Sequence, residues 1–292
     1  MALTCHSEYG KIHSLLLKSV NDAFFNETHV SENWKKLNYL AMPYMDHALK
    51  EYQYFEAIIK STISSVTYLP FDRSVNMDSI YCRDAAIATN AGMLLCNMGK
   101  EERKKEPSAL RKALEDNDIK ILGEITSPGS VEGGDVAWLG EHILAVGLTY
   151  RTNKEGIRQL TELITPLGVE VITVSMPHYK GQKDVFHLMS ILSPIDKNVA
   201  VVYSPLMPID FRNYLLNNDF LLIDVPDDEF DSMGCNVLAL APRTCVMVDG
   251  NPKTKSKLES EGFEVLVYEG NEISLKGGGG PTCLTRPIQR IV

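Results

Sequence analysis

Residue types that together support covalent catalysis recur at matching places along the chain. Asp84, Glu132, His187 and Cys283 each stand near the start of a segment patterned as a β-hairpin. A thiol can attack carbon, an imidazole can move protons, and carboxylates can hold a cation or orient the imidazole. The set indicates nucleophilic catalysis at a carbon flanked by positive charge, and a guanidinium fits that description.

Cys283 follows the segment Lys276–Thr282, which contains four consecutive glycines. Such a run is costly in conformational entropy and packs nothing, so something must need its backbone close. We interpret the segment as a loop whose bare amides approach a ligand and present Cys283; a flexible linker is the alternative. The other five cysteines show no C-x-x-C pair or zinc spacing. We therefore expect reduced, mostly buried thiols and no metal site.

Three charges interrupt a run that is otherwise patterned as a strand, namely Asp78, Arg83 and Asp84. A charge in such a place is costly unless it is paired, so an ion pair is one explanation of Arg83. In Glu132–Asp135 two glycines separate two acids, which predicts a tight turn beside close-packed backbone. His187 taken alone would be structural, and only its register with the other hairpin starts makes it a candidate.

The chain repeats one unit, in which a hairpin is followed by a helix and a further strand. The hairpin turns recur at intervals of roughly 50 residues, a period typical of propellers and arrays. The predicted hairpins are Ser79–Asn97, Asp135–Leu148, Leu188–Ser204 and Asn236–Val248; the helices are Glu101–Asp118, Asn153–Leu167, Pro208–Asn218 and Lys253–Glu261; the closing strands are Ile119–Gly123, Val169–Ser175, Phe220–Val225 and Glu264–Tyr268.

A fifth unit would use both ends of the chain and so close a ring. This predicts an α/β protein, a five-bladed propeller of ββαβ units. An open mixed sheet with two lobes is the alternative. The parts of this unit would be an opening strand at Leu37–Met42, a helix at Met45–Lys60, a closing strand at Val66–Leu69 and the hairpin partner at Thr282–Val292.

Residues 1–35 stand outside this repeat and are predicted to be an N-terminal helical extension, with 36–292 as a single catalytic domain. The extension is expected to contain a short amphipathic helix, because apolar residues occur with helical spacing. These residues are Ile12, Leu15, Leu16 and Val20.

Composition describes an ordinary soluble globular protein with 44% hydrophobic residues, 23% charged residues and a formal net charge of −9. The acidic balance, without a Lys/Arg stripe, argues against nucleic acid and membrane partners. The apolar run Leu15–Leu17 is too short for a signal peptide or a membrane span, so a cytoplasmic location is expected. Oligomeric state, including a homodimer, is left open.

Five motifs together carry a specific resemblance. They are Asp78-x-x-x-x-Arg83-Asp84, Val131–Asp135, Val146–Asn153, His187–Ser190 and Gly280–Thr285. In this order the chain resembles the guanidino-modifying (pentein) superfamily over about residues 36 to 290, and within it the dimethylarginine dimethylaminohydrolases and their bacterial relatives. The resemblance implies a five-bladed α/β propeller, in agreement with the repeat.

The resemblance also implies roles for individual residues. Cys283 would be the nucleophile, His187 the general acid/base, and Glu132 the carboxylate that orients and charges the histidine. Asp78 would bind the guanidinium nitrogens, supported by Asp84.

Three arginines are assigned to the substrate site in the same way. Arg151 matches the family's ligand for the substrate α-carboxylate. Arg103 stands where a second such arginine is expected, with a solvated helix face as the alternative. Arg83 stands where many members carry an acid, so it would either sit beside the guanidinium or form an internal ion pair.

The reaction implied is cofactor-free hydrolysis of a small guanidino substrate through a thiouronium intermediate. Met189 stands where arginine and agmatine deiminases carry an aspartate, and an apolar side chain there favours a substituted nitrogen, as in dimethylarginine, which would give citrulline and an alkylamine. An amidinotransferase, a deiminase or dihydrolase acting on another guanidine, and a non-catalytic pentein are the alternatives. A cysteine amide hydrolase fits less well, because acids oppose a developing oxyanion.

Overall fold

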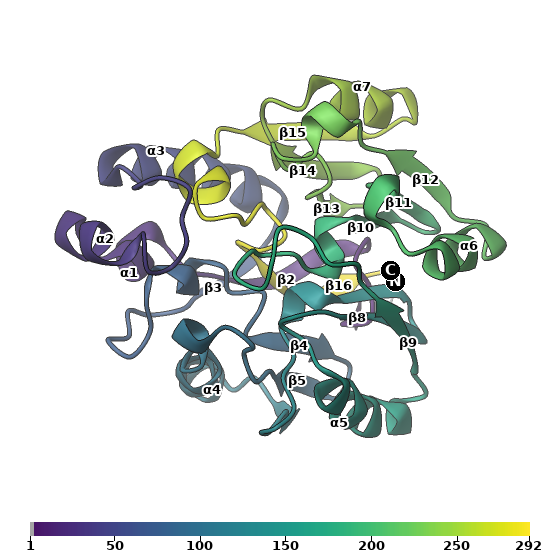
Figure 1. Cartoon of the computed structure of the whole chain (residues 1–292), viewed down its shortest axis with the longest axis horizontal. Coiled ribbons are helices and arrows are strands. Elements are labelled where there is room, and N and C mark those ends of the chain that lie inside the picture. The colour runs from purple at the N-terminus through teal and green to yellow at the C-terminus, as the bar shows by residue number, and fades with distance from the viewer. Residues whose placement is uncertain (1–2) are drawn as a thin grey trace.

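The strands of the chain form five small sheets arranged around a common centre. The computed structural model describes residues 3–292. Four sheets have three strands each and one has four. Figure 1 shows the sheets as a ring, with helices α3 to α7 on its outside. This architecture confirms the predicted five-bladed α/β propeller.

Each three-stranded sheet pairs an antiparallel hairpin with a third, parallel strand, and one helix makes the crossover. The chain runs through β4 (Ala86–Thr89), β5 (Gly92–Leu95), α4 (Glu106–Asp116) and β6 (Ile121–Glu124); β7 (Val136–Gly140), β8 (Ile143–Leu148), α5 (Lys154–Ile164) and β9 (Glu170–Ser175); β10 (Leu192–Asp196), β11 (Val199–Val202), α6 (Ile209–Asn217) and β12 (Leu221–Asp224); and β13 (Leu238–Ala241), β14 (Thr244–Val248), α7 (Pro252–Ser260) and β15 (Glu264–Tyr268). These elements confirm the four predicted units.

In each three-stranded sheet the two hairpin strands are more buried than the third, parallel strand. All four residues of β11 are buried, for example, whereas β9 at the outside has exposed positions. Helix α5 packs one face on its sheet through Ile157, Leu160 and Ile164, which follow helical spacing. Its first turn is capped by Asn153, whose side chain accepts a hydrogen bond from Gly156 N.

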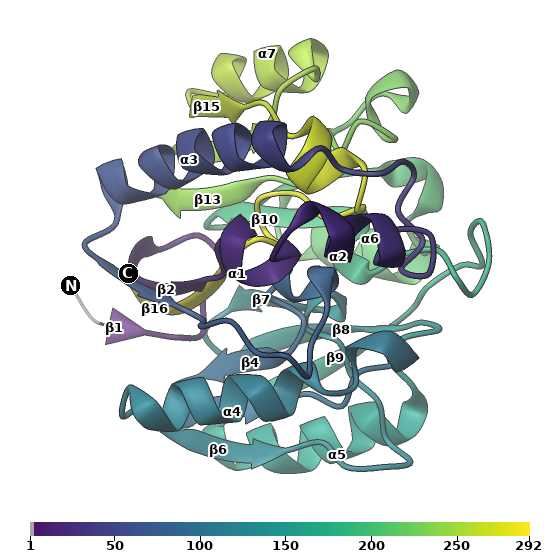
Figure 2. The same cartoon turned by 90° about the vertical axis from the view of Figure 1, so that its left-hand side faces the viewer.

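The first sheet joins both ends of the chain, in the order β1 (Leu3–Thr4), β16 (Arg286–Ile291), β2 (Lys11–Leu17) and β3 (Ser65–Tyr68). The C-terminal strand is therefore the hairpin partner, as predicted. Figure 2 shows β2 beside β16. The opening strand is β2, however, and the prediction of Leu37–Met42 in that role is wrong, because these residues form a loop.

The predicted helix through Ile12, Leu15 and Leu16 is also wrong. This segment lies between β16 and β3, and its run Leu15–Leu17 is buried on both faces, a pattern that central strands share with helices. The prediction of a separate extension at residues 1–35 is thus corrected, because a boundary after residue 35 would divide this sheet. Helices do follow β2, and they cover the sheet on one side (Figure 2). They are α1 (Val20–Phe24), α2 (Glu27–Asn33) and α3 (Met45–Thr62).

The six cysteines between residues 3 and 292 are all free. Cys82, Cys96, Cys235 and Cys245 are buried, as expected for small apolar side chains, whereas Cys5 and Cys283 are partly exposed. No helix in the described part of the chain is both long and apolar enough to cross a membrane.

Candidate active site

The segments that precede strands β4, β7, β10 and β16 meet near the centre of the ring. Asp84, Glu132 and His187 come before β4, β7 and β10, and Cys283 comes before β16. His187 Nε2 lies 2.8 Å from Glu132 Oε2, and His187 Nδ1 lies 4.0 Å from Asp84 Oδ1. The carbonyl of Cys283 accepts a hydrogen bond of 3.2 Å from the backbone N–H of Arg83, next to Asp84. The structure thus brings together the four residues that were predicted from their equivalent positions at the starts of the hairpins.

Two glycines allow this convergence. A Cβ on Gly134 would lie 2.3 Å from His187 Nδ1 and 2.9 Å from Asp84 Oδ1. A Cβ on Gly133 would lie 2.2 Å from the Arg83 carbonyl oxygen. Both contacts are shorter than side chains tolerate, so the predicted close-packed turn exists and brings the Glu132 segment against the histidine.

His187 is buried among carboxylates that favour its charged form. Burial acts to lower the pKa of His187, but the charges of Asp135 and Asp84 and the hydrogen bond to Glu132 outweigh it and raise the pKa to about 9. Burial likewise acts to raise the pKa of Glu132, yet His187 and Arg151 hold that pKa well below its usual range. The pair is therefore an imidazolium and a carboxylate at neutral pH.

Cys283 is the one partly exposed thiol at this site. Its Sγ lies 3.6 Å from Asn236 Nδ2 and 3.8 Å from Thr282 Oγ1. Burial and the negative charge of Asp84 raise the pKa of Cys283, while the hydrogen bonds from Thr282 and Asn236 oppose that rise. A nearby cation would favour the thiolate, and a guanidinium substrate would supply one.

Three of the four glycines before Cys283 pack tightly, which contradicts the interpretation of the run as a flexible linker. A Cβ on Gly277 would lie 1.9 Å from Tyr81 Oη, one on Gly279 would lie 2.5 Å from the Tyr81 ring, and one on Gly280 would lie 2.5 Å from Asn236 Oδ1. The glycines are needed because aromatic and amide side chains press against this backbone. The run is therefore not a flexible linker, and two of its glycines, Gly277 and Gly278, line the cavity of about 350 Å³ beside the site. Its predicted approach to a ligand stays a prediction.

Asp78 is buried and already has a cationic partner. Lys100 Nζ lies 2.7 Å from Asp78 Oδ2 and also donates to the Leu37 carbonyl at 2.8 Å. The backbone N–H of Lys100 donates to Glu132 Oε1 at 2.9 Å, which ties this residue to the catalytic candidates. Among residues 3–292, no group donates a hydrogen bond to the other carboxylate oxygen of Asp78, Oδ1. This oxygen therefore has no hydrogen-bond donor within the described part of the chain.

Arg83 and Arg103 do not sit where substrate-binding arginines are expected. Arg83 is fully buried and forms an ion pair of 2.7 Å with Glu8, so the internal ion pair explains it. Arg103 donates to both oxygens of Glu106, to the Tyr81 carbonyl and, at 2.5 Å, to Asp84 Oδ2. These contacts engage four of the five N–H donors of its guanidinium, which corrects its predicted role: it positions Asp84.

Arg151, by contrast, makes only long polar contacts through its guanidinium within residues 3–292. Its Nη1 lies 3.7 Å from Glu132 Oε1, and its Nη2 lies 3.5 Å from the Lys183 carbonyl. Buried guanidinium groups form strong bonds to anions, and here that capacity is unused. Arg151 can therefore receive a substrate carboxylate, as the resemblance implies.

Three residues of the site were missed as site residues. Asp135 accepts hydrogen bonds from Leu188 N and Thr149 Oγ1 and faces His187; burial raises the pKa of Asp135 to about 6. Asn236, the hydrogen-bond donor to Cys283, stands before β13, at the remaining hairpin start. The position of Asn236 at a hairpin start, equivalent to the other site residues, could have identified it from the sequence. No pattern in the neighbouring sequence indicates that Lys100 pairs with Asp78.

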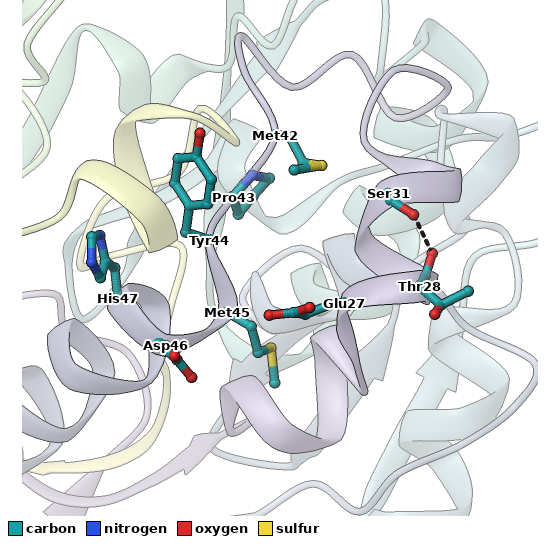
Figure 3. A pocket seen from close by; sticks show the side chains of 9 residues that line it. All are labelled: Glu27, Thr28, Ser31, Met42, Pro43, Tyr44, Met45, Asp46 and His47. Atoms are coloured by element: carbon teal, nitrogen blue, oxygen red, sulfur yellow. Dashed lines mark hydrogen bonds between the residues drawn. The ribbon is translucent and has the colours of Figure 1, made fainter.

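A cavity of about 350 Å³ adjoins the site. Its lining includes Asn236, the residues Phe186 and Ser190 on either side of the His187 segment, and Asp184. A larger open pocket of about 670 Å³ lies elsewhere, between α2 and the start of α3 (Figure 3). None of the predicted site residues lines that pocket, so its size does not make it the active site. It is lined by Glu27, Thr28, Ser31, Met42, Pro43, Tyr44, Met45, Asp46 and His47.

Asp84, Glu132 and His187 each offer a ligand atom within 4.8 Å of the others, close enough to hold a metal ion. The charges around them oppose that use. Arg103 is ion-paired with Asp84, and Arg151 lies near Glu132. The imidazolium of His187 would also have to lose its proton before it could bind a metal. The cluster fits proton transfer better than metal binding.

Known proteins share this fold and sequence pattern along most of the chain. The N(G),N(G)-dimethylarginine dimethylaminohydrolase of Pseudomonas aeruginosa is 25% identical over 248 residues, which cover 85% of this chain and 91% of the relative. The uncharacterized protein YkgA of Bacillus subtilis is 24% identical over 98% of this chain and 95% of its own.

Two solved structures have closely similar folds. The Pseudomonas enzyme, as a cysteine-to-serine mutant complexed with citrulline, has a TM-score of 0.74 at 21% identity and covers 94% of this chain and 98% of its own. The product-bound N-terminal domain of ArgZ, a cyanobacterial arginine dihydrolase, has a TM-score of 0.79 at 18% identity, with 95% and 97% covered.

The fold and site together define a guanidino-modifying hydrolase of the pentein superfamily. The sequence pattern of the family described as eukaryotic N,N-dimethylarginine dimethylhydrolase matches residues 21–290. The chain belongs to this family, which confirms the resemblance.

Proposed function

We propose that the chain is a cysteine-dependent hydrolase of an N-substituted guanidine such as dimethylarginine, releasing citrulline and an alkylamine. The observation that carries the proposal is the hydrogen bond of 2.8 Å between buried His187 and Glu132, in the group of hairpin starts that also holds the partly exposed Cys283. This combination provides a proton donor of raised pKa and a reachable thiol in one site.

Charged groups at the site suit the two ends of an arginine derivative. Asp78 Oδ1 is open to accept a hydrogen bond from a guanidinium nitrogen, and Asp84 adds negative charge nearby. Arg151 is the candidate for the α-carboxylate. Bound in this way, the guanidinium cation would also favour the Cys283 thiolate, whose pKa is otherwise raised.

The reaction begins when the Cys283 thiolate forms a C–S bond to the guanidinium carbon. As the bond from that carbon to the alkylated nitrogen breaks, the His187 imidazolium gives its proton to the departing amine, and a planar thiouronium remains on sulfur. Neutral His187 then takes a proton from water, and the hydroxide adds to the same carbon. As the C–S bond breaks and returns the thiolate, the added hydroxyl group loses its proton to solvent, where the released amine takes it up. The neutral ureido product leaves, so one water is consumed per turnover.

The surroundings of His187 support a substituted nitrogen. Met189 is buried in an apolar cluster with Phe186 and Leu188, and it has no carboxylate to hold an unsubstituted terminal nitrogen. No metal or organic cofactor enters this mechanism. A cytoplasmic location is part of the proposal, because the nucleophile must stay reduced.

The ion pair between Lys100 and Asp78 favours a second candidate, hydrolysis of another guanidino compound. Lys100 offsets the charge that would hold the guanidinium. A less cationic guanidine, or one that displaces Lys100, would suit this charge balance. An amidinotransferase would use the same residues but hand the amidino group to an amine.

The test is a product screen by mass spectrometry in ¹⁸O-labelled water. Dimethylarginine, monomethylarginine, arginine and agmatine would each be offered with and without glycine. We expect ¹⁸O-labelled citrulline and dimethylamine from dimethylarginine, and no product from Cys283→Ser protein, with Cys5→Ser as the matched control. An amidino group on glycine would support the transferase instead. No turnover, together with no labelling of Cys283 by 2-chloroacetamidine, would contradict catalysis.

A further inference from the structure

A cluster of buried charge lies next to the active site but is not used by the mechanism. Arg286 and Arg290 stand on β16, Arg83 stands before β4, and Glu8 lies between β1 and β2. The exposed fractions are 0% for Arg83, 4% for Arg286, 1% for Arg290 and 6% for Glu8. Buried arginines are rare unless they are paired, so this group requires an explanation.

The cluster has more positive than negative charge. Glu8 Oε1 lies 2.7 Å from Arg83 Nη2, and among residues 3–292 no other carboxylate lies within 4 Å of the three guanidinium groups. Backbone carbonyls accept the remaining hydrogen bonds. Arg286 Nη2 donates to the Arg83 carbonyl at 3.1 Å, and Arg290 Nη1 donates to Gly10 at 2.6 Å and Ala239 at 2.8 Å. Carbonyls carry only partial charge, so two positive charges remain without a counter-charge.

Several of the guanidinium nitrogens also lack an acceptor. Arg83 Nε and Nη1, Arg286 Nε, and Arg290 Nε and Nη2 are buried and donate to no group between residues 3 and 292. An unused charged donor in a protein interior is costly. The cost can be removed by an acceptor that also brings negative charge.

The alternative, loss of a proton, is chemically unfavourable. Burial lowers the pKa of Arg286 to about 10 with a further contribution from the charge of Arg83; burial also lowers the pKa of Arg290 to about 9, where Arg83 and Arg286 act in the same direction. The guanidinium groups thus repel one another. Arginine nevertheless stays protonated in proteins, so the repulsion has to be relieved by a counter-ion.

We propose that Arg83, Arg286 and Arg290 form a buried binding site for a small monovalent inorganic anion of the halide type, chloride in particular. A halide accepts hydrogen bonds from any direction, so it can use N–H groups that belong to three separate side chains. It would offset part of the excess charge without needing donors or acceptors of its own. The site would stabilise the junction between β16 and the segment that carries Asp84, and it is independent of the proposed reaction.

The first test compares thermal unfolding of the whole protein in sodium chloride, sodium bromide and sodium gluconate at equal ionic strength. Chloride and bromide should raise the melting temperature by about 5 °C at saturation relative to the bulky gluconate, because a ligand bound only to the folded state stabilises it. Crystals grown in bromide should show an anomalous peak among the three guanidinium groups. Equal melting temperatures and no bromide peak would overturn the proposal.

Two variants should shift the halide dependence in opposite directions. Glu8→Gln keeps an acceptor for Arg83 but removes the negative charge, so the chloride concentration at half-effect should fall at least about tenfold. Arg290→Met removes one charge and two unused donors, so the chloride effect should be lost. The control is Arg158→Ala, an exposed arginine paired with Glu155 and Glu162, which should leave it unchanged.

The Glu8→Gln measurement and the bromide peak remain decisive if Arg290→Met does not fold. An unchanged half-effect concentration in Glu8→Gln, or a bromide peak only at surface lysines, would show that the melting shift arises elsewhere.

Discussion

Arg83 and Asp84 are consecutive residues, yet their side chains belong to two buried clusters of opposite charge. Asp84 bonds to Arg103 and to the backbone N–H of Gly134 beside His187. Arg83 bonds to Glu8. Both residues lie in the turn that precedes β4, and this one short segment supplies both clusters.

The two clusters differ in how their charge is balanced. On the acidic side Glu132 is paired with His187, Asp84 with Arg103 and Asp78 with Lys100. On the basic side, among residues 3–292, Glu8 is the one carboxylate within 4 Å of the three arginines, and it pairs with Arg83. Burial of charge therefore does not by itself identify a catalytic site. What separates the acidic cluster is that Glu132, Asp84 and Asp78 each have a cationic partner and that a partly exposed thiol, Cys283, adjoins it.

The distinction between the two clusters would fail if catalysis did not depend on the Cys283 thiol. Cys283→Ser exchanges the nucleophilic sulfur for a hydroxyl of far higher pKa, so kcat should fall at least about 10³-fold. The fold should persist, because the residue lies outside regular elements and the glycine packing before it is unchanged. Product formation and urea denaturation would be measured together.

Cys5→Ser is the matched control, since Cys5 is the other partly exposed free thiol. It should keep full activity. Retained turnover in Cys283→Ser would move the chemistry to another group and leave the acidic cluster as a structural network.

The part of the site that could be predicted from the sequence is the set of residues at equivalent positions of the repeat. Asp84, Glu132, His187 and Cys283 were found because the pattern of hairpin starts is local, and a ring converts equivalent positions into neighbours. The same rule covers Asn236, which was overlooked because an amide in a loop is common.

Partners of buried charges could not be predicted in this way. Lys100 pairs with Asp78 across 22 positions of the sequence, and Arg83 pairs with Glu8 across 75. Such choices depend on which loops come together in the folded chain. The strand at Leu15–Leu17 was missed for a related reason: a short run buried on both faces shows no alternation, so periodicity does not separate strand from helix.

The arginines near the site differ in whether their N–H donors already have close partners in the protein, and a substitution of Arg151 tests this difference. Arg151→Ala should raise the KM for dimethylarginine about 30-fold, the loss expected when a charged hydrogen bond to the carboxylate is removed, with kcat changed only slightly. Agmatine-like substrates lack the carboxylate and should show little change in KM. Steady-state kinetics on both substrates would be compared.

Arg103→Ala is the variant to compare with Arg151→Ala, because Arg103 positions Asp84 and does not bind the ligand. It should reduce activity on both substrates equally and lower the melting temperature. Equal KM effects of Arg151→Ala on the two substrates would remove Arg151 from carboxylate binding.

Lys100 tests whether the charge balance at Asp78 controls affinity. Lys100→Met removes the ammonium that competes with a guanidinium for this carboxylate, so KM for cationic guanidines should fall about threefold to tenfold. Unfolding free energy should also decrease by about 1 to 3 kcal/mol, because a buried carboxylate loses its partner. Lys104→Met is the control, as Lys104 is exposed and pairs with Glu101. A rise in KM would show instead that Lys100 helps to bind the substrate.

The smallest expected effect concerns the buried imidazolium of His187 in the acidic cluster. It is tested through the pH dependence of the free energy of unfolding. The pKa of His187 is about 9 in the folded protein, against an ordinary value of 6.5, so the folded state holds this proton more tightly. The contribution to stability is fully present below pH 6.5 and is lost as the pH rises to about 9, at about 1.4 kcal/mol per pH unit. Urea denaturation across this range would measure the slope.

His187→Gln should flatten this slope, because glutamine does not titrate. His142→Gln should preserve it, since His142 is an exposed histidine that contacts only the Gly168 carbonyl through Nδ1. A wild-type stability curve that stays level between pH 7 and 9 would mean that Glu132, Asp84 and Asp135 do not hold an imidazolium. The acidic cluster would then differ from the arginine cluster in sign alone, and the general acid of the proposed reaction would have to be sought elsewhere.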